Sequence, residues 1–149
     1  RPDVTFERAR ETYLANLRFA AEACKAHGVK VLIEPLNRFD VPGYFLTSNA
    51  QALEVIADAG SDKLFLQFDL YHTQRTHGEL ANTLRACLPH IAHIQIADNP
   101  GRHQPGTGEI NFPFLLKLID TLGYQGWVGC EYTALGDITA AFAWRDALT

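Results

Sequence analysis

The sequence predicts an α/β fold in which parallel strands alternate with helices, as they do in a (β/α)8 barrel. Four short apolar runs recur along the chain, with segments of helical character between them, and in each run a polar residue follows the apolar stretch. The runs are VKVLIEPLN (29–37), KLFLQFDLY (63–71), HIAHIQIAD (90–98) and GWVGCEYT (126–133). Because a closed barrel needs eight strand–helix units, residues 1–149 are expected to supply about four of them as a single domain segment.

The first helix is expected over 5–27, where apolar residues recur at helical spacing on one stripe. Thr5 is suited to cap its amino end, and Gly28 to end it in a left-handed conformation. A strand over 29–34 follows.

Ser48 and Gln51 have the spacing of a capping box, which predicts a helix over 49–59 that ends at Gly60. The rest of the chain repeats the alternation. The expected elements are strand 64–69, a short loop, helix 78–88, strand 91–97, a long Gly- and Pro-rich loop over 97–111, helix 113–122, strand 127–131 and a last helix over 138–147.

A polar residue closes every predicted strand, and the four are Glu34, Asp69, Gln95 and Glu131. The carboxyl ends of barrel strands meet at one face, so these side chains are expected to converge. Three carboxylates and one amide would repel one another there unless a divalent cation held them. All-oxygen ligands suit Mg²⁺ or Mn²⁺, and the absence of Cys and His among the four disfavours zinc.

The phase of the strands supports this prediction. Side chains alternate along a strand, so the layer below the four polar residues is expected to be Leu32, Gln67, His93 and Gly129. The opposite face is uniformly apolar, with Leu66, Phe68, Ile94 and Ile96. A single Asp or Glu at a strand end is more often only solvated, but four in matching phase favour a metal site.

Two further residues are candidates for contact with a substrate. His72 is expected on the loop above the second strand, and Arg102, in the long loop, has a planar fork suited to a substrate carboxylate. The alternative for each is an ordinary surface residue. GTG (106–108) has the look of a phosphate-binding loop, but glycines in such a loop usually serve a turn.

Composition excludes several classes of function. A net charge of −4 and a pI near 5.8 give no reason to expect nucleic acid or an anionic membrane as partners. The three cysteines lack metal-type spacing and are expected to be buried free thiols of a cytoplasmic protein. The chain contains no methionine, which indicates a segment of a longer protein.

Several motifs closely resemble the hydroxypyruvate isomerase family, which belongs to the xylose-isomerase-like TIM barrels. They are IEPLNRFDVPGYFLT (33–47), QFDLYHTQR (67–75), HIQIADNPGRHQPGTGEINF (93–112) and GYQGWVGCEY (123–132). The resemblance covers essentially the whole chain and implies that it is the C-terminal half of a barrel. It also implies a divalent metal, Mg²⁺ or Mn²⁺, on Glu34, Asp69, Gln95 and Glu131, the same residues that strand phase selects.

The resemblance further implies an activity. The reaction would interconvert hydroxypyruvate and tartronate semialdehyde (2-hydroxy-3-oxopropanoate) by metal-assisted proton transfer through an enediolate. Glu34 and Glu131 would be the catalytic proton donor and acceptor, and His72, Arg102 and Asp40 would contact the small-molecule substrate.

Other functions stay open from the sequence. A 2-oxotetronate isomerase or a ketose 3-epimerase would use the same chemistry with a different pocket. A DNA-repair endonuclease on this barrel would need several zinc ions, more histidine ligands and a basic face. An inactive half-barrel, forming a homodimer through its exposed edges, is the reading without enzymatic activity.

Overall fold

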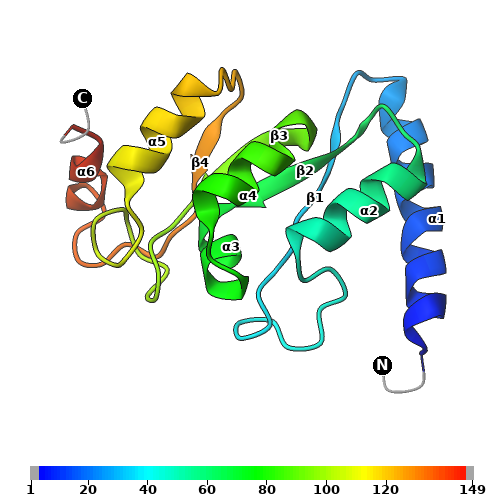
Figure 1. Ribbon diagram of the computed structural model, residues 1–149, viewed down its shortest axis with the longest axis horizontal. Helices are drawn as coiled ribbons and strands as arrows, with labels where there is room; N and C mark the ends of the chain where they lie inside the picture. Colours follow the sequence, from blue (N-terminus) through cyan, green and yellow to red (C-terminus); the bar gives the residue numbers. More distant parts are fainter. Residues whose placement is uncertain (1–3, 147–149) are drawn as a thin grey trace.

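The structure is a computed structural model that describes residues 4–146, and it contains one parallel sheet (Figure 1). The strands follow chain order, β1 (Val31–Ile33), β2 (Leu64–Asp69), β3 (Ile91–Ile96) and β4 (Val128–Cys130). The helices are α1 (Phe6–Lys25), α2 (Asn49–Ala59), α3 (Leu70–Thr76), α4 (Leu80–Cys87), α5 (Phe112–Thr121) and α6 (Ala143–Asp146), with 3-10 turns η1 (Leu88–His90) and η2 (Ala140–Phe142). The predicted alternation of strands and helices is confirmed.

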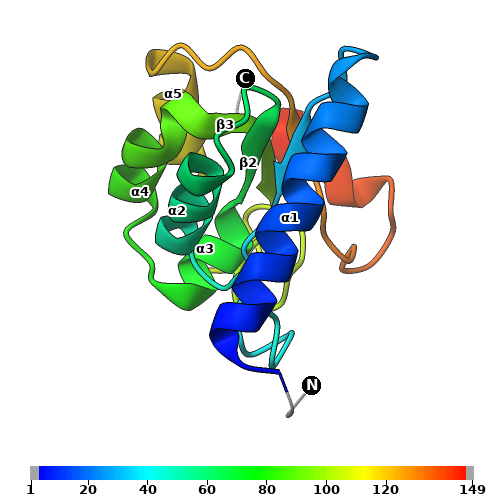
Figure 2. The same cartoon turned by 90° about the vertical axis from the view of Figure 1, so that its right-hand side faces the viewer.

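Helices cover one face of the sheet, with α2 and α4 lying against β2 and β3 (Figure 2). The apolar residues expected on that face are buried in the core: Leu66, Phe68, Ile94 and Ile96. The residues expected on the other face, Leu32, Gln67, His93 and Gly129, are only partly buried. The predicted assignment of the two faces is therefore correct, and the functional residues belong to the less covered one.

Helix α1 begins and ends as predicted. The Oγ1 of Thr5 accepts a hydrogen bond from the backbone N–H of Arg8 at 3.2 Å, and Gly28 adopts a left-handed φ of 68° just past the helix. The inner stripe of the helix buries Leu14, Leu17 and Ala21. This packing holds the amino-terminal helix beside β1.

Helix α2 has half of the expected capping box. Ser48 accepts from the N–H of Gln51 at 3.2 Å, but the Gln51 side chain turns to the N–H of Thr47 at 2.9 Å. Gly60 closes the helix with a φ of 66°. The Gln51 side chain therefore links the loop before α2 to the first turn of the helix, because it also donates to the carbonyl of Phe45.

The segment after β2 differs from the prediction. A short loop was expected, but α3 starts at once at Leu70, because the side chain of Asp69 caps it by accepting from the N–H of His72 at 2.9 Å. The expected helix over 78–88 is the shorter α4, which Gly78, at a φ of 67°, separates from α3.

The carboxyl-terminal segment also differs. The expected helix over 138–147 is broken into η2 and α6, and residue 147 lies outside the described residues. All three cysteines are free thiols, but of these only Cys87 is buried and Cys130 is exposed. Among the described helices, none has the length and apolar character needed to cross a bilayer.

Candidate metal and catalytic site

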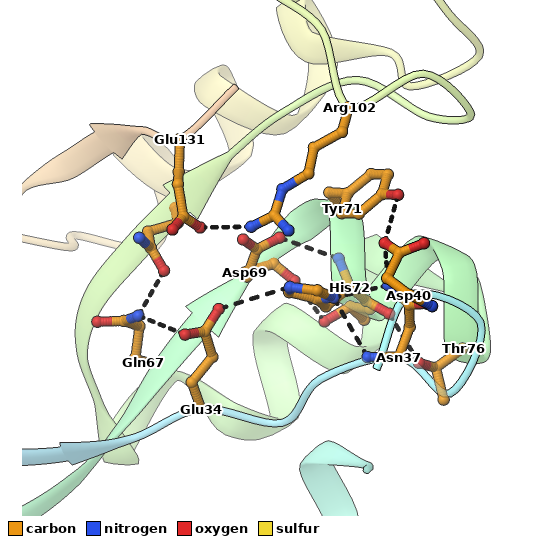
Figure 3. Close-up of polar contacts among 12 residues, drawn as sticks. Glu34, Asn37, Asp40, Gln67, Asp69, Tyr71, His72, Thr76, Arg102 and Glu131 are labelled. Carbon is orange, nitrogen blue, oxygen red and sulfur yellow. Dashed lines mark hydrogen bonds and ion pairs between the residues drawn. The ribbon is translucent and has the colours of Figure 1, made fainter. Parts of the chain in front are cut away.

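The four strand-end residues lie at the same end of the sheet. Asp69 and Gln95 are direct partners in the register of β2 and β3. Glu34 and Glu131 come immediately after β1 and β4, and the N–H of Glu131 still donates to the carbonyl of Ile96 at 3.1 Å. Figure 3 shows Glu34, Asp69 and Glu131 around a common space, with Arg102 reaching in from its loop.

Gln67 links two of these residues. Its Nε2 donates to Oε2 of Glu34 at 2.8 Å and to Oε1 of Gln95 at 2.5 Å. Strand phase places Gln67 one layer below the site, but its side chain is long enough to reach up between β1 and β3. This role of Gln67 was not predicted, although a polar residue that faces inward in an apolar strand is a visible signal of it.

Glu34 and Asp69 carry the clearest mark of an ion site. Oε1 of Glu34 and Oδ2 of Asp69 are buried and have no hydrogen-bond partner. Burial, followed by the charges of Asp69 and Glu131, raises the pKa of Glu34 from 4.5 to about 7. Burial is also the main cause that raises the pKa of Asp69 from 3.8 to about 6. The positive charge of Arg102 lowers both pKa values, but not by enough to offset the burial of the two carboxyl groups.

His72 was expected on a loop, and that placement is wrong. It lies in α3 with only 2% of the residue exposed, because the helix begins directly after Asp69. Its Nε2 is 3.9 Å from Oε1 of Glu34, and ligand atoms of Glu34, Asp69 and His72 lie within 4.8 Å of one another. Burial, followed by the charge of Arg102, lowers the pKa of His72 to about 4, so the ring is neutral at physiological pH.

Arg102 closes the opposite side of the site. Its Nη2 pairs with Oε2 of Glu131 at 2.7 Å, and its guanidinium carbon lies 5.2 Å from the ring centre of Tyr71. The Arg102 backbone has a left-handed φ of 54°, and its carbonyl accepts from the N–H of Thr133 at 2.9 Å. The loop after β3 is thus anchored to the segment after β4 at the residue that enters the site.

A buried aspartate, Asp98, organises the long loop that carries Arg102. Its carboxylate accepts hydrogen bonds of 2.9 to 3.1 Å from the backbone N–H groups of Asn99, Gly106, Gly108 and Ile110. This carboxylate explains the GTG segment (106–108), because the backbone N–H groups of both of its glycines donate to Asp98. An aspartate at the start of a Gly-rich loop was the available signal.

Asp40 lies on the far side of His72 from Glu34 (Figure 3). Its Oδ2 accepts from the hydroxyl of Tyr71 at 2.6 Å and from Nδ2 of Asn37 at 2.9 Å, and its Oδ1 pairs with Arg75 at 3.3 Å. The Asp40 carboxylate therefore already has three partners, and its contacts lie within this network of side chains.

The donor set fits a hard divalent cation. Two buried carboxylate oxygens without partners come from neighbouring strands, and oxygens of Gln95 and Glu131 lie on the next two strands at the same end. Oε1 of Gln95 already accepts one bond from Gln67, but an amide oxygen has a second lone pair. A divalent cation at this position would offset the repulsion between the closely spaced carboxylates.

The site opens onto the less covered face of the sheet. A hollow of about 830 Å³ lies elsewhere, between the start of α1 and the loop over 35–48, and none of the four strand-end residues lines it.

Comparisons with known proteins identify the family to which the chain is similar. The sequence model of the xylose isomerase-like TIM barrel family matches residues 1–148. A hydroxypyruvate isomerase of Escherichia coli is 47% identical over 140 residues, or 94% of this chain and 54% of that enzyme. A 2-oxo-tetronate isomerase of Cupriavidus necator is 46% identical over 142 residues, or 95% and 55%.

A solved structure gives the same picture. The crystal structure of an AP endonuclease of family 2 from Brucella melitensis is 36% identical and superposes with a TM-score of 0.94. It covers 97% of this chain, while this chain covers 56% of it. The chain therefore spans about half the length of the proteins that it matches.

Proposed function

The chain belongs to the xylose isomerase-like TIM barrel family, and from this premise we propose that it forms the catalytic half of a hydroxypyruvate isomerase. The remaining strands of the barrel would come from the rest of a longer polypeptide, of which this chain would supply about half. The observation that carries the proposal is the pair of buried, unpartnered carboxylate oxygens on Glu34 and Asp69, in a chain 47% identical to a hydroxypyruvate isomerase.

Glu34, Asp69, Gln95 and Glu131 would hold the cation, with Mg²⁺ or Mn²⁺ as the ions that suit an all-oxygen site. When bound, such an ion stabilises negative charge on the substrate's carbonyl and hydroxyl oxygens as a Lewis acid. Its positive charge would also favour the ionised form of Glu34 and Asp69, whose pKa values are raised without it.

The isomerisation needs one proton to leave C3 of hydroxypyruvate and one to arrive at C2, while a second proton passes from the C3 hydroxyl to the C2 oxygen. Glu34 and Glu131 stand at the two edges of the site, on the strands that are farthest apart in the sheet. We assign the two carbon proton transfers to them, one as base and the other as acid.

Arg102 is suited to bind the substrate carboxylate through its planar fork. It already enters the site and pairs with Glu131, so a bound substrate would place its carboxylate beside this ion pair. His72, neutral and buried, would donate a hydrogen bond to a substrate oxygen. Asp40 would support the site through its contacts with Tyr71 and Arg75.

A 2-oxo-tetronate isomerase is the second candidate, because such an enzyme is 46% identical to this chain. The proton transfers would be the same and the substrate longer. An endonuclease is disfavoured: the described residues group one histidine with the carboxylates, and the net charge is −4.

The test is a comparison of two substrates with the longer polypeptide, supplied with Mg²⁺ or Mn²⁺ and then treated with EDTA. Metal-dependent turnover with a higher kcat/KM for hydroxypyruvate supports the proposal. A higher kcat/KM for 2-oxotetronate selects the second candidate. If neither substrate reacts while the metal binds, both assignments of substrate fail.

A further inference from the structure

We propose that Asn37 is a positioning residue that fixes the tautomer of His72, so that Nε2 carries the proton and faces the carboxylate site. Asn37 lies three residues after Glu34, in the loop that follows β1, and none of its surface is exposed. Strand phase does not select it, and it lies within the motif over 33–47 without a role assigned from the sequence. The hydrogen bonds around Asn37 together allow one arrangement of protons.

The orientation of the Asn37 amide is determined by its neighbours. One amide atom accepts hydrogen bonds from the backbone N–H groups of Phe39 at 3.0 Å and Asp40 at 2.9 Å. Backbone N–H groups only donate, so this atom must be the oxygen Oδ1. The other atom is therefore the nitrogen Nδ2, and both of its hydrogens are available to acceptors.

Those hydrogens have two acceptors within reach. Nδ2 of Asn37 lies 2.9 Å from Oδ2 of Asp40 and 2.7 Å from Nδ1 of His72. The backbone N–H of Asn37 also points at the same Nδ1, at 3.2 Å. Two donors from one residue thus converge on one ring nitrogen.

A proton on Nδ1 of His72 would face both of these donors. Nδ1 must therefore be the unprotonated nitrogen, and in the neutral ring the proton lies on Nε2. Nε2 lies 3.9 Å from the unpartnered Oε1 of Glu34. The geometry directs an N–H donor into the site where a substrate oxygen would lie.

The same arrangement decides whether His72 binds the metal. By distance alone it groups with Glu34 and Asp69. Coordination through Nε2 would require the opposite tautomer, with a proton on Nδ1 that conflicts with both donors of Asn37. His72 is therefore a hydrogen-bond donor beside the metal ligands and does not join them.

A second set of contacts holds Asn37 in place. Asp40, which accepts one Nδ2 hydrogen, is itself fixed by the hydroxyl of Tyr71 at 2.6 Å and by Arg75 at 3.3 Å. Asp40 thus acts on His72 through Asn37. The role of His72 toward substrate rests on the proposed function, whereas the tautomer itself does not.

The test uses the longer polypeptide without metal, labelled with ¹⁵N at histidine, and long-range ¹H–¹⁵N correlations that distinguish the two neutral tautomers. In the wild type, Nδ1 of His72 is expected to be unprotonated and Nε2 protonated. A protonated Nδ1 in the wild type would overturn the proposal without any variant. Mg²⁺ should leave the Nε2 proton in place, and loss of that proton on Mg²⁺ binding would also overturn it.

The informative variant is the double change Asn37→Asp and Asp40→Asn, which exchanges donor and acceptor between these two positions and keeps their mutual hydrogen bond. It places a carboxylate oxygen against Nδ1, so Nδ1 should gain a proton. Asn49→Asp is the matched control, since Asn49 is also buried and contacts α3, through Thr73 at 2.9 Å. In the control the His72 tautomer should stay as in the wild type.

An unprotonated Nδ1 in the double variant would overturn the proposal, because it would show that the backbone N–H of residue 37 suffices and that the Asn37 side chain does not set the tautomer. A protonated Nδ1 in the Asn49→Asp control would attribute the effect to any change near α3 and would likewise overturn the proposal. If the wild type and both variants behave as expected but the polypeptide does not isomerise hydroxypyruvate, only the proposed function fails.

Discussion

The two glutamates of the site occupy matching positions at strand ends but have opposite environments. The Glu34 side chain is 20% exposed, accepts a hydrogen bond from Gln67 and leaves one buried oxygen without a partner. The Glu131 side chain is 47% exposed and pairs with Arg102 at 2.7 Å. The Glu34 carboxylate is shielded from water, whereas the Glu131 carboxylate is paired with a positive charge, although both residues follow a short apolar strand.

This difference shows how one residue type acquires two roles. Burial raises the pKa of Glu34 to about 7 in the metal-free protein, and a bound cation would lower this pKa again. Glu131 instead pairs with Arg102, which would also bind the carboxylate of a substrate. We expect Glu34 to respond most to the metal and Glu131 to respond most to the substrate.

The largest expected effect comes from removing either carboxylate. Glu34→Gln and Glu131→Gln in the longer polypeptide should each lower kcat by about 10²–10⁴-fold, because each loses one partner of the proton transfers. Steady-state kinetics at saturating Mg²⁺ measure this. Near wild-type kcat in one variant would assign both proton transfers to the other glutamate. Glu7→Gln, an exposed change in α1, is the control.

Asp69→Asn should act on the metal before it acts on chemistry. It removes a ligand charge, so metal affinity should fall by at least the roughly 10–100-fold that follows the loss of a residue that only orients a ligand. Titration calorimetry with Mn²⁺ measures this affinity. An unchanged affinity would exclude Asp69 from the ligand set.

Arg102→Lys tests the side of the site that holds Glu131. The ammonium group keeps the charge but loses the planar fork, so kcat/KM should fall by about 10–100-fold, mainly through KM. Kinetics across a range of hydroxypyruvate concentrations separate the two parameters. A fall in kcat alone would mean that Arg102 serves Glu131 and does not bind the substrate.

The smallest effect concerns the stability of the metal-free protein. The folded state binds a proton on Glu34 with a pKa of about 7, against an ordinary 4.5, so it holds more protons than the unfolded state in this interval. The contribution of Glu34 to the free energy of unfolding should therefore fall as the pH rises from 4.5 to 7, by on the order of 1–2 kcal/mol after solvent screening. Urea titrations at several pH values measure it.

Two comparisons check the source of this pH dependence. Glu34→Gln should remove the contribution of Glu34, because the amide does not titrate, whereas Glu7→Gln should leave the dependence unchanged. The raised pKa of Asp69, which acts in the same direction, and the lowered pKa of His72, which acts in the opposite direction, should still contribute in the Glu34→Gln variant. Saturating Mg²⁺ should stabilise the protein more at pH 7.5 than at pH 5, since the ion favours the ionised carboxylates. A pH dependence that is the same in Glu34→Gln as in the wild type would contradict the raised pKa of Glu34.

Much of the fold could be predicted from the sequence. The alternation of apolar residues along each strand and the inward direction of the polar residue at its end both follow from the pleat of a β-strand, in which successive side chains point to opposite faces. The four strands, their parallel order and the apolar face with Phe68 and Ile94 were predicted correctly. The resemblance to hydroxypyruvate isomerases was also confirmed, by a hydroxypyruvate isomerase that is 47% identical, and a 2-oxo-tetronate isomerase is 46% identical. These features are repeated along the chain, so errors at single positions do not change them.

The errors occurred where one side chain serves two elements. Asp69 ends β2 and also caps α3, so no stop signal separates the strand from the helix that carries His72. The last predicted helix is broken into η2 and α6, although Asp137 accepts hydrogen bonds from the backbone N–H groups of Thr139 and Ala140, which are contacts that favour the start of a helix. Asn37 and Asp98 were missed because their roles depend on backbone N–H groups, which a sequence does not place.

The most direct test of the proposed site is the binding of Mn²⁺ to the wild-type polypeptide and to Glu34→Gln and Glu131→Gln, followed by electron paramagnetic resonance of the free ion. The four-residue site predicts one tightly bound Mn²⁺ per chain and weaker binding in both variants. Wild-type affinity in Glu131→Gln would remove the exposed glutamate from the site. Wild-type affinity in both variants would contradict the site itself.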